Sequence, residues 1–307
     1  MNKVFDKGEV YTVIVTPFDD EDKIIYSDFD NLINYQIKNG VNGIILLGTT
    51  SESPTIDSEE QKEIVDYVWN RFNGQIKIVV GIGGNNTKKV IEFGRFCVDK
   101  CNAFMVTVPN YNKPTQNGIF EHFLKIAQDD ILKNKEIIIY NIPSRCGINM
   151  DPDAIIGLYN ICENITAIKE ASGSLTQIRK IKERCNINIY SGDDLNILPI
   201  MSLGGVGVIS VASNIMPKEI CELVNLCNNN NFSRANSIFY QISEFIENLF
   251  LVSNPIPIKY VLFKNGLISN DNMRLPLTRL IEQEDSNVIK KLNNFKIQVN
   301  KELISNY

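Results

Sequence analysis

Short runs of β-branched and other apolar residues recur along the chain about every 20 to 35 residues, a pattern typical of buried strands. Polar and turn-forming residues bound each run. The pattern predicts eight strands, at Val10–Val15, Gly43–Leu47, Ile76–Gly81, Ala103–Val108, Glu136–Tyr140, Ile165–Lys169, Ile187–Tyr190 and Val206–Val211.

The stretches between these runs place apolar residues at helical spacing. Ser58 and Gln61 have the spacing of a capping box, so Ser58 is expected to cap its helix. Pro152 lies near the start of another helix, where its missing N–H is harmless. The expected helices are Ser27–Asn39, Ser58–Phe72, Lys88–Lys100, Ile119–Lys133, Asp151–Tyr159, Leu175–Cys185 and Asp194–Leu203.

Eight strand and helix units in about 220 residues predict an α/β fold, a closed (β/α)8 TIM barrel. The alternative is an open, doubly wound sheet. That fold favours a Gly-x-Gly-x-x-Gly turn after the first strand, and the chain has none there. Gly81–Gly84, after the third strand, does not have this spacing and is interpreted as a tight turn.

The pattern becomes helical beyond Met216. Asn228–Asn230 is expected to form a turn between helices, and Asn254–Pro257 an interruption. We therefore expect a (β/α)8 barrel at residues 1–230 and a C-terminal helical domain at residues 231–307.

Composition and charge exclude several classes of partner. The net charge is −5, and no cluster of Lys and Arg is flanked by aromatic residues, so nucleic acid is not expected as a partner. An anionic ligand would need local positive groups. No apolar run approaches the roughly 18 residues of a membrane span. The N-terminus lacks the apolar core of a signal peptide, so a cytoplasmic location is expected.

The cysteines and the single histidine argue against several kinds of catalytic site. None of the seven cysteines forms a Cys-x-x-Cys pair, so neither a zinc site nor a disulfide framework is expected. His122 lies in an expected helix, where a packing or surface role is the simpler interpretation. Catalysis by a serine–histidine or cysteine–histidine pair is therefore not expected, and no cofactor motif is present.

The stretch Ile165–Gly173 ends a predicted buried strand with a lysine. Alternate side chains of a strand share a face, so Ala167 leaves room along the path of the Lys169 side chain. A buried charged lysine is costly unless it is paired. A neutral amine in an apolar pocket, however, is the nucleophile that forms Schiff bases with carbonyl compounds. The structural alternative is a lysine that reaches water beyond the strand end.

Chemistry in a barrel occurs at the carboxyl ends of its strands, and polar groups follow several of the predicted strands. Taken singly, Thr49 is interpreted as a cap, Tyr140 as core and Arg145 as a solvated charge. Their convergence with Lys169 at one barrel mouth favours catalysis. The segments concerned are Gly48–Glu52, Pro109–Asn112, Tyr140–Arg145, Ser191–Asp194 and Ile209–Ser210.

These segments contain an ordered set of motifs that resembles the dihydrodipicolinate synthase family, within the pyruvate-dependent class I aldolases that include N-acetylneuraminate lyase. The resemblance runs from Val10 to about Leu277, and the order and spacing of the motifs make it far more specific than any one of them. The motifs are VTPF, GTTSES, PNYNKPTQ, YNIPSR, IKEASG, SGDD, GVISV and NPIPIK.

The resemblance implies roles for individual residues. Lys169 corresponds to the Schiff-base lysine and Tyr140 to the proton-transfer tyrosine above it. Thr49 corresponds to the residue that links Tyr140 to Tyr111, which in this family comes from the neighbouring subunit. The substrate-binding candidates are Thr50 for the pyruvate carboxylate, Arg145 for the carboxylate of the second substrate, and Ile209 and Gly192 for the pocket wall.

The resemblance also implies the reaction and the assembly. Pyruvate and L-aspartate 4-semialdehyde would condense in the diaminopimelate route to lysine, without a cofactor, on a homotetramer that is a dimer of dimers. Burial would lower the pKa of Lys169 from its usual value near 10.4, which allows the neutral amine to attack the ketone. A phenol and hydroxyl chain would then move protons without histidine.

Two alternatives remain on the sequence alone. One is another member of the same family, a sialic-acid lyase or a 2-keto-3-deoxy sugar acid aldolase. Thr49-Thr50 and Ser144-Arg145 resemble the synthase pattern instead. The other alternative is a non-catalytic barrel that binds a keto acid as a sensor, against which Lys169, Tyr140 and Thr49 together argue.

The chain departs from the family pattern at two positions of the catalytic motifs and at those that bind lysine in feedback-inhibited relatives. Ser51 replaces a usual glycine, and a positive φ there would cost serine about 1 kcal/mol. Asn110 replaces the aromatic residue before Tyr111. Lys89 occupies the position of an acid that binds lysine in feedback-inhibited relatives, and the stretch Ser58–Gln61 lacks their histidines. The ammonium of Lys89 would repel the ammonium of free lysine, which a carboxylate at this position would attract with an energy of order 4 kcal/mol. Insensitivity to inhibition by lysine is therefore expected.

Overall fold

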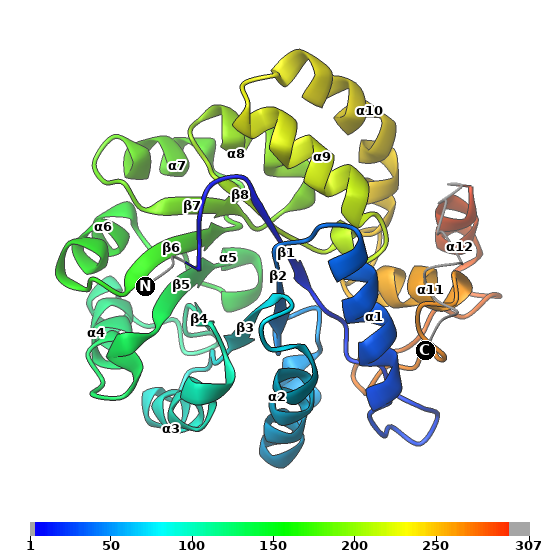
Figure 1. Cartoon of the computed structure of the whole chain (residues 1–307), viewed down its shortest axis with the longest axis horizontal. Coiled ribbons are helices and arrows are strands. Elements are labelled where there is room, and N and C mark those ends of the chain that lie inside the picture. Colours follow the sequence, from blue (N-terminus) through cyan, green and yellow to red (C-terminus); the bar gives the residue numbers. More distant parts are fainter. Residues whose placement is uncertain (1–3, 295–307) are drawn as a thin grey trace.

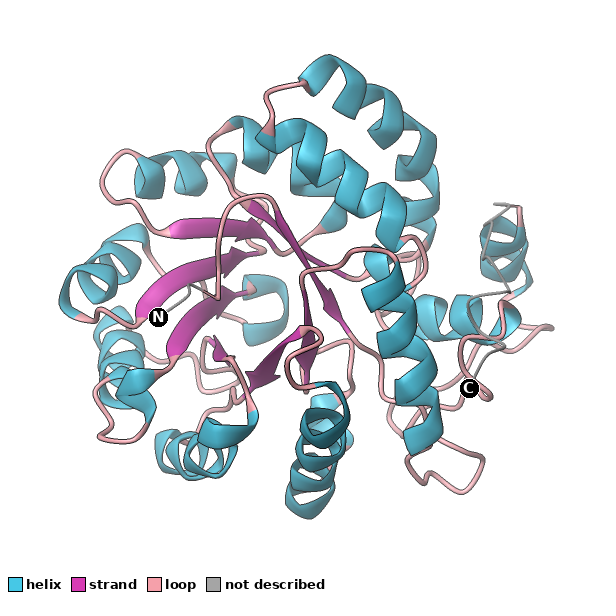
Figure 2. Cartoon of the chain, in the orientation of Figure 1, coloured by secondary structure: helices cyan, strands magenta, loops and turns pink. Residues whose placement is uncertain are grey.

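The computed structural model describes residues 4–294, which form a closed parallel barrel surrounded by helices (Figures 1 and 2). Each strand pairs with the next in sequence, and β8 pairs with β1, so no strand edge stays open. Within the described residues the strands are β1 (Glu9–Val13), β2 (Gly43–Leu46), β3 (Lys77–Gly81), β4 (Ala103–Thr107), β5 (Glu136–Asn141), β6 (Ile165–Glu170), β7 (Asn188–Ser191) and β8 (Gly207–Ser210).

This arrangement confirms the predicted (β/α)8 barrel and all eight predicted strands, and it rules out the open sheet. Helices form a ring outside the strands (Figure 2). The helices of the barrel are α1 (Tyr26–Lys38), α2 (Ser58–Phe72), α3 (Thr87–Cys97), α4 (Gln116–Ala127), α5 (Pro143–Cys146), α6 (Pro152–Ile161), α7 (Leu175–Lys182), α8 (Ile197–Ser202) and α9 (Pro217–Asn228).

Several helices differ from the sequence prediction at their ends. The segments predicted to end at Lys100 and Lys133 finish instead with short 3-10 helices, Val98–Lys100 and Leu132–Asn134, and the segment predicted from Asp194 begins with one. The four-residue helix α5 was not predicted, because it is too short to show a period. It follows β5 directly and carries Arg145 to the barrel mouth.

The predicted cap of α2 is wrong by one residue. Ser58 is the first helical residue, and Asp57 is the cap. The Asp57 carboxylate accepts from the amides of Glu59 and Glu60, both at 2.9 Å, and the Glu60 carboxylate accepts from the Asp57 amide at 3.1 Å. This is a reciprocal capping box built from Asp and Glu, and the positive end of the helix also attracts the Asp57 carboxylate. Pro152 is, as predicted, at the start of its helix.

The apolar core has two layers. The larger lies between the strands and the outer helices and includes Ile168, whereas the smaller fills the barrel interior and includes Ala167. At the amino end of the barrel, Phe5 packs against Tyr11 and Tyr190, with ring centroids 5.5 and 5.9 Å apart. Because these side chains fill the amino end, we expect a ligand to reach the barrel interior from the carboxyl ends of the strands.

The chain beyond the barrel is helical, with α10 (Phe232–Asn248), α11 (Ile256–Lys264) and α12 (Ser286–Asn293). The predicted turn after Asn228 and the interruption before α11 are both present. Helix α10 packs on α9 and α8, and α11 lies on the side of the barrel near α1 (Figure 1). Residues 1–3 of the expected barrel domain (1–230) and residues 295–307 of the expected C-terminal domain (231–307) lie outside the described residues. No helix within residues 4–294 is both long and apolar enough to span a membrane.

Candidate active site

A pocket of about 310 Å³ opens at the carboxyl ends of the strands. Loops after β2, β5, β6 and β7 form its wall, together with the segment between α10 and α11. Six of the eight residues proposed from the sequence line it. The lining residues are Thr49, Thr50, Tyr140, Ile142, Ser144, Arg145, Lys169, Ala171, Gly192, Asp193, Leu195, Val211, Phe250 and Asn254.

Lys169 is the buried amine of this pocket. It lies near the end of β6, paired in register with Tyr140 on β5, and only 4% of it is exposed. Its Nζ atom lies 4.1 Å from the centroid of the Tyr140 ring. Burial lowers the pKa of Lys169 to about 7; the negative charge of Asp194 opposes this shift and the positive charge of Arg145 adds to it. A large share of this amine is therefore neutral near pH 7 and can attack a carbonyl carbon.

Tyr140 and Thr49 form a hydrogen-bonded pair of hydroxyls beside this amine. Burial raises the pKa of the Tyr140 phenol, whereas the Thr49 contact and the Arg145 charge act against that shift. The phenol is therefore protonated at neutral pH. It can donate a proton and receive another, which is what a proton relay requires.

Thr50 and Arg145 are joined by a residue that the sequence reasoning missed. The side-chain amide of Asn254 donates to Thr50 Oγ1 at 3.0 Å, and the backbone carbonyl of Asn254 accepts from an Arg145 guanidinium nitrogen at 3.0 Å. The sequence indicated Asn254 only as a break between helices. Its presence in the motif NPIPIK was the one available signal, and that motif carried no chemical role.

Of the other three predicted site residues, one lines the pocket and two do not. Gly192 lines the pocket, and a Cβ atom there would lie 3.1 Å from Lys169 Cγ, so glycine leaves room for the lysine side chain. Ile209 lies in the barrel interior and is not among the lining residues. Tyr111 is 86% exposed with φ of 65°, and it does not line the pocket within this chain.

A second hollow of about 280 Å³ adjoins the first. The two share Thr49, Ile142 and Arg145, and the second also contacts Asn110 on the loop that carries Tyr111. A third hollow, of about 220 Å³, is lined by Gln61 and Lys89, among others. Lys89 therefore places a positive charge beside that third hollow.

The loop after β2 accommodates Ser51 without the expected strain. The residues with positive φ in this loop are Leu47 and Glu52, not Ser51. The Ser51 hydroxyl instead donates to the Ile14 carbonyl at 2.6 Å and accepts from the Gly48 amide at 3.2 Å. Serine at this position thus ties the loop to the residue that follows β1, and the conditional cost of about 1 kcal/mol does not apply.

His122 packs as a buried helix residue, in agreement with the simpler interpretation. Its Nδ1 atom lies 2.9 Å from the Thr87 hydroxyl, and its ring stands edge-on to Phe123. Burial lowers its pKa to about 4, so the ring is neutral at physiological pH. His122 does not line the pocket of Lys169.

A closed parallel barrel with a buried, partly neutral lysine at its carboxyl mouth defines a class I aldolase-type lyase. Comparison with known families agrees with this class. The model of the Dihydrodipicolinate synthetase family matches residues 6–295, and the chain belongs to that family.

Individual relatives cover almost the whole chain. A 4-hydroxy-tetrahydrodipicolinate synthase of Methanococcus maripaludis is 39% identical over 286 residues, which span 93% of this chain and 97% of the relative. The crystal structure of dihydrodipicolinate synthase from Aquifex aeolicus superposes with a TM-score of 0.90 at 35% identity, over 96% of this chain and all of that one. The enzyme of Acinetobacter baumannii, solved as a complex with pyruvate, gives 0.88 at 32% identity, over 94% of this chain and 99% of that one.

Proposed function

We propose that the chain is a 4-hydroxy-tetrahydrodipicolinate synthase, which condenses pyruvate with L-aspartate 4-semialdehyde in the diaminopimelate route to lysine. The observation that carries this proposal is the buried Lys169 amine beside Tyr140, with Thr50 and Arg145 at the same mouth. Both substrates carry a carboxylate. A hydroxyl and a guanidinium are groups that bind carboxylates well.

The proposed reaction begins when neutral Lys169 attacks the ketone carbon of pyruvate. Water leaves, and the resulting imine acidifies the methyl group. Loss of a methyl proton through Tyr140 gives an enamine, whose carbon attacks the aldehyde carbon of the second substrate. The amine of that substrate then attacks the imine carbon, which closes the ring and releases Lys169. Tyr140 and Thr49 carry the protons of these steps.

Initial rates separate this function from its rivals. Purified protein should consume pyruvate with L-aspartate 4-semialdehyde and should not cleave N-acetylneuraminate or a 2-keto-3-deoxy sugar acid at a comparable rate. Faster turnover of a sugar acid would assign the chain to another activity of the same family. An imine with pyruvate but no turnover of any aldehyde would favour a keto-acid sensor.

The pH dependence follows from the pKa of Lys169. Because burial lowers that pKa to about 7, the reactive neutral form predominates above this pH and is lost below it. We expect kcat/KM for pyruvate to rise tenfold per pH unit well below about pH 7 and to level off above it, since this ratio reports the free enzyme. A steady-state profile in which kcat/KM still climbs steeply toward pH 10 would show that the amine has an ordinary pKa.

We also propose that Tyr111 completes the active site of a neighbouring subunit within a homotetramer. An exposed tyrosine at positive φ, which directly follows Asn110 of the second hollow, supports this proposal. Tyr111→Phe and Tyr140→Phe chains, each nearly inactive alone, should regain part of the native rate when they are refolded together. Verified mixed dimers without any regained activity would contradict a shared site.

Insensitivity to lysine is a further expectation. Lys89 lines the third hollow, and its ammonium would repel that of free lysine. A full contact of this kind is of order 4 kcal/mol. If only a quarter of it remains after solvation, replacing the attractive carboxylate by a repelling ammonium still changes the binding energy by about 2 kcal/mol, which weakens binding more than tenfold. Initial rates measured across a lysine titration should stay constant. Strong inhibition at sub-millimolar lysine would contradict this expectation.

The location and the domain division are part of the same proposal. All seven cysteines are free and none forms a disulfide, which fits a cytoplasmic enzyme. Residues 1–230 would form the catalytic barrel. The C-terminal helical domain would supply a part of the pocket wall, since Phe250 and Asn254 line it.

A further inference from the structure

Asn254 lies between two groups that come from distant parts of the barrel. Its side-chain Nδ2 atom donates to Thr50 Oγ1, in the loop after β2, and its backbone carbonyl accepts from Arg145, on α5, both at 3.0 Å. Asn254 and Thr50 are 7% and 2% exposed. One residue of the C-terminal segment therefore contacts both proposed carboxylate-binding groups.

The direction of the first hydrogen bond decides what Thr50 can do. A threonine hydroxyl has one proton and two lone pairs. Because the Asn254 amide donates to the Thr50 oxygen, the hydroxyl proton points elsewhere. Within residues 4–294 no other hydrogen bond involves this hydroxyl. The proton is thus available to an acceptor in the pocket, such as a carboxylate.

The second contact restrains a side chain that would otherwise be free to move. Arg145 is an exposed residue, and it lines both adjoining hollows. One guanidinium nitrogen donates to the Asn254 carbonyl, which leaves the other nitrogens to face a ligand. Restraining a long side chain before the ligand arrives reduces the entropy that binding must overcome.

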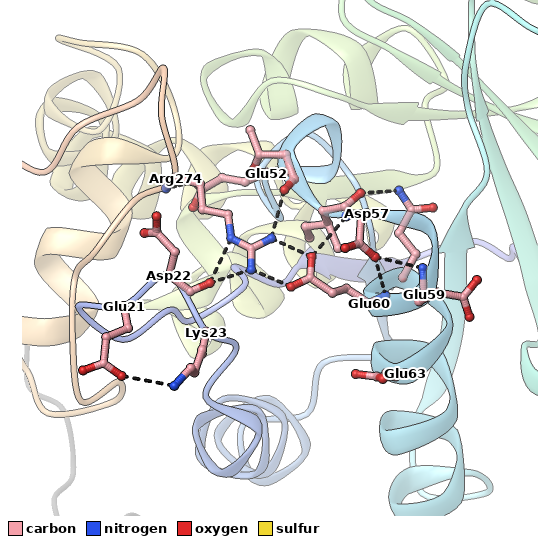
Figure 3. Close-up of polar contacts among 12 residues, drawn as sticks. Glu21, Asp22, Lys23, Glu52, Asp57, Glu59, Glu60, Glu63 and Arg274 are labelled. Carbon is pink, nitrogen blue, oxygen red and sulfur yellow. Dashed lines mark hydrogen bonds and ion pairs between the residues drawn. The ribbon is translucent and has the colours of Figure 1, made fainter.

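A buried ion pair keeps Asn254 in position. Lys259, on α11, donates to Glu52 at 2.6 Å and to the Asn272 carbonyl at 2.7 Å, and the Lys259 and Glu52 side chains are 0% and 1% exposed. Glu52 also accepts from the Arg274 amide at 3.2 Å. Figure 3 shows Arg274 between Glu52 and Glu60, with Glu60 at 2.6 Å. The loop of Thr50 and the start of α11 are therefore fixed to each other at two points.

We propose that Asn254 is a positioning residue, which aims the hydroxyl proton of Thr50 and the guanidinium of Arg145 at the substrate carboxylates. Asn254 acts through these two groups and does not itself react. The proposal rests on the proposed function, because it assigns those carboxylates to pyruvate and the aldehyde substrate. It also explains why a residue of the C-terminal segment lies in the pocket of the barrel.

A double-mutant cycle on the KM for pyruvate tests this proposal. Asn254→Leu should raise that KM about tenfold, equivalent to about 1.4 kcal/mol, with a smaller change in kcat. Thr50→Val should raise it as well. If the Asn254 side chain acts through Thr50, the double variant should be no worse than Thr50→Val alone. The side-chain interaction is already lost in Thr50→Val, and the backbone carbonyl that accepts from Arg145 is present in every variant. If the two single substitutions raise the KM for pyruvate independently, so that their free-energy effects add in the double variant, the proposal is overturned.

The pH dependence of the KM for pyruvate in Asn254→Asp is a second test, because a purely structural role of Asn254 would not produce one. An ionised carboxylate accepts from Thr50, turns its proton away from the pocket and repels the substrate carboxylate. The KM for pyruvate, relative to the native chain at the same pH, should rise more than tenfold at pH 8 and should recover as the new carboxyl protonates toward about pH 5. A ratio that does not change with pH would contradict the proposed direction of the hydrogen bond.

Controls separate loss of folding from loss of positioning. Asn265, at the far end of α11, donates to the Val261 carbonyl at 2.8 Å and lies outside the pocket, so Asn265→Leu should leave the KM unchanged. The cycle is repeated with Asn254→Ala, and thermal unfolding is measured for each chain. A native chain that forms no imine with pyruvate would overturn the proposed function and this inference together. If the native chain forms the imine normally but the effects of the two substitutions on the KM for pyruvate add fully, only the inference about Asn254 is overturned.

Discussion

Replacing Lys169 by alanine is expected to lower turnover by at least about 10⁴-fold, because the covalent route through the imine is lost. Pyruvate should no longer become attached to the protein in the presence of borohydride. The barrel should remain folded, since the lysine side chain is not part of the apolar core layers. Steady-state rates, intact-protein mass and thermal unfolding measure these three outcomes.

Lys259 offers a matched comparison, because it is the other lysine that is buried within the described residues. Lys259 is paired with Glu52, whereas no salt bridge involves Lys169 within residues 4–294. Removal of Lys259 should therefore destabilise the fold by leaving a buried carboxylate unpaired, at a cost of about 3 to 5 kcal/mol. Undiminished attachment of pyruvate in Lys169→Ala would place the imine on another lysine.

Tyr140→Phe is expected to lower kcat by about 10² to 10⁴-fold, the usual range for a group that transfers protons in the transition state. The phenol contacts Thr49 and lies beside Lys169, so its loss interrupts the relay while the ring continues to fill its place. The KM for pyruvate should change much less than kcat. Stopped-flow measurement of imine formation and steady-state kinetics would separate these effects.

Tyr11→Phe is the matched control for that variant. The Tyr11 hydroxyl bonds to Glu9 at 2.9 Å at the amino end of the barrel, outside the pocket. Its loss should lower stability by about 1 kcal/mol without a comparable loss of kcat. If both variants lose kcat equally, the loss in Tyr140→Phe comes from removing a buried hydroxyl group in general and not from interrupting proton transfer.

The barrel was predictable because its signals are local. Each strand is a short apolar run, and alternation within a strand placed Ala167 and Lys169 on one face. The topology then brought the polar strand ends to a single mouth, so Thr49, Tyr140 and Lys169 were predicted as one group. The cap of α2 was displaced by one residue because Asp57 and Ser58 are both good caps.

The remaining features depend on contacts between distant segments. Asn254 and Thr50 are 204 positions apart, and so no local pattern indicates their hydrogen bond. The same holds for Glu52 and Lys259, which are 207 positions apart. The hydrogen bond from Ser51 to Ile14, just after β1, also joins distant segments, and the spacing of the motif GTTSES does not reveal it. Tyr111 does not line the pocket of its own chain, so its proposed role depends on a neighbouring subunit that no pattern within one chain describes.

The most direct test of the central claim is peptide mapping of the native protein after borohydride reduction with pyruvate. The account predicts one reduced pyruvyl group on the peptide that contains Lys169, formed at a rate that rises with pH through about 7. An adduct on a different lysine, or no adduct under conditions in which the protein turns over pyruvate, would contradict it.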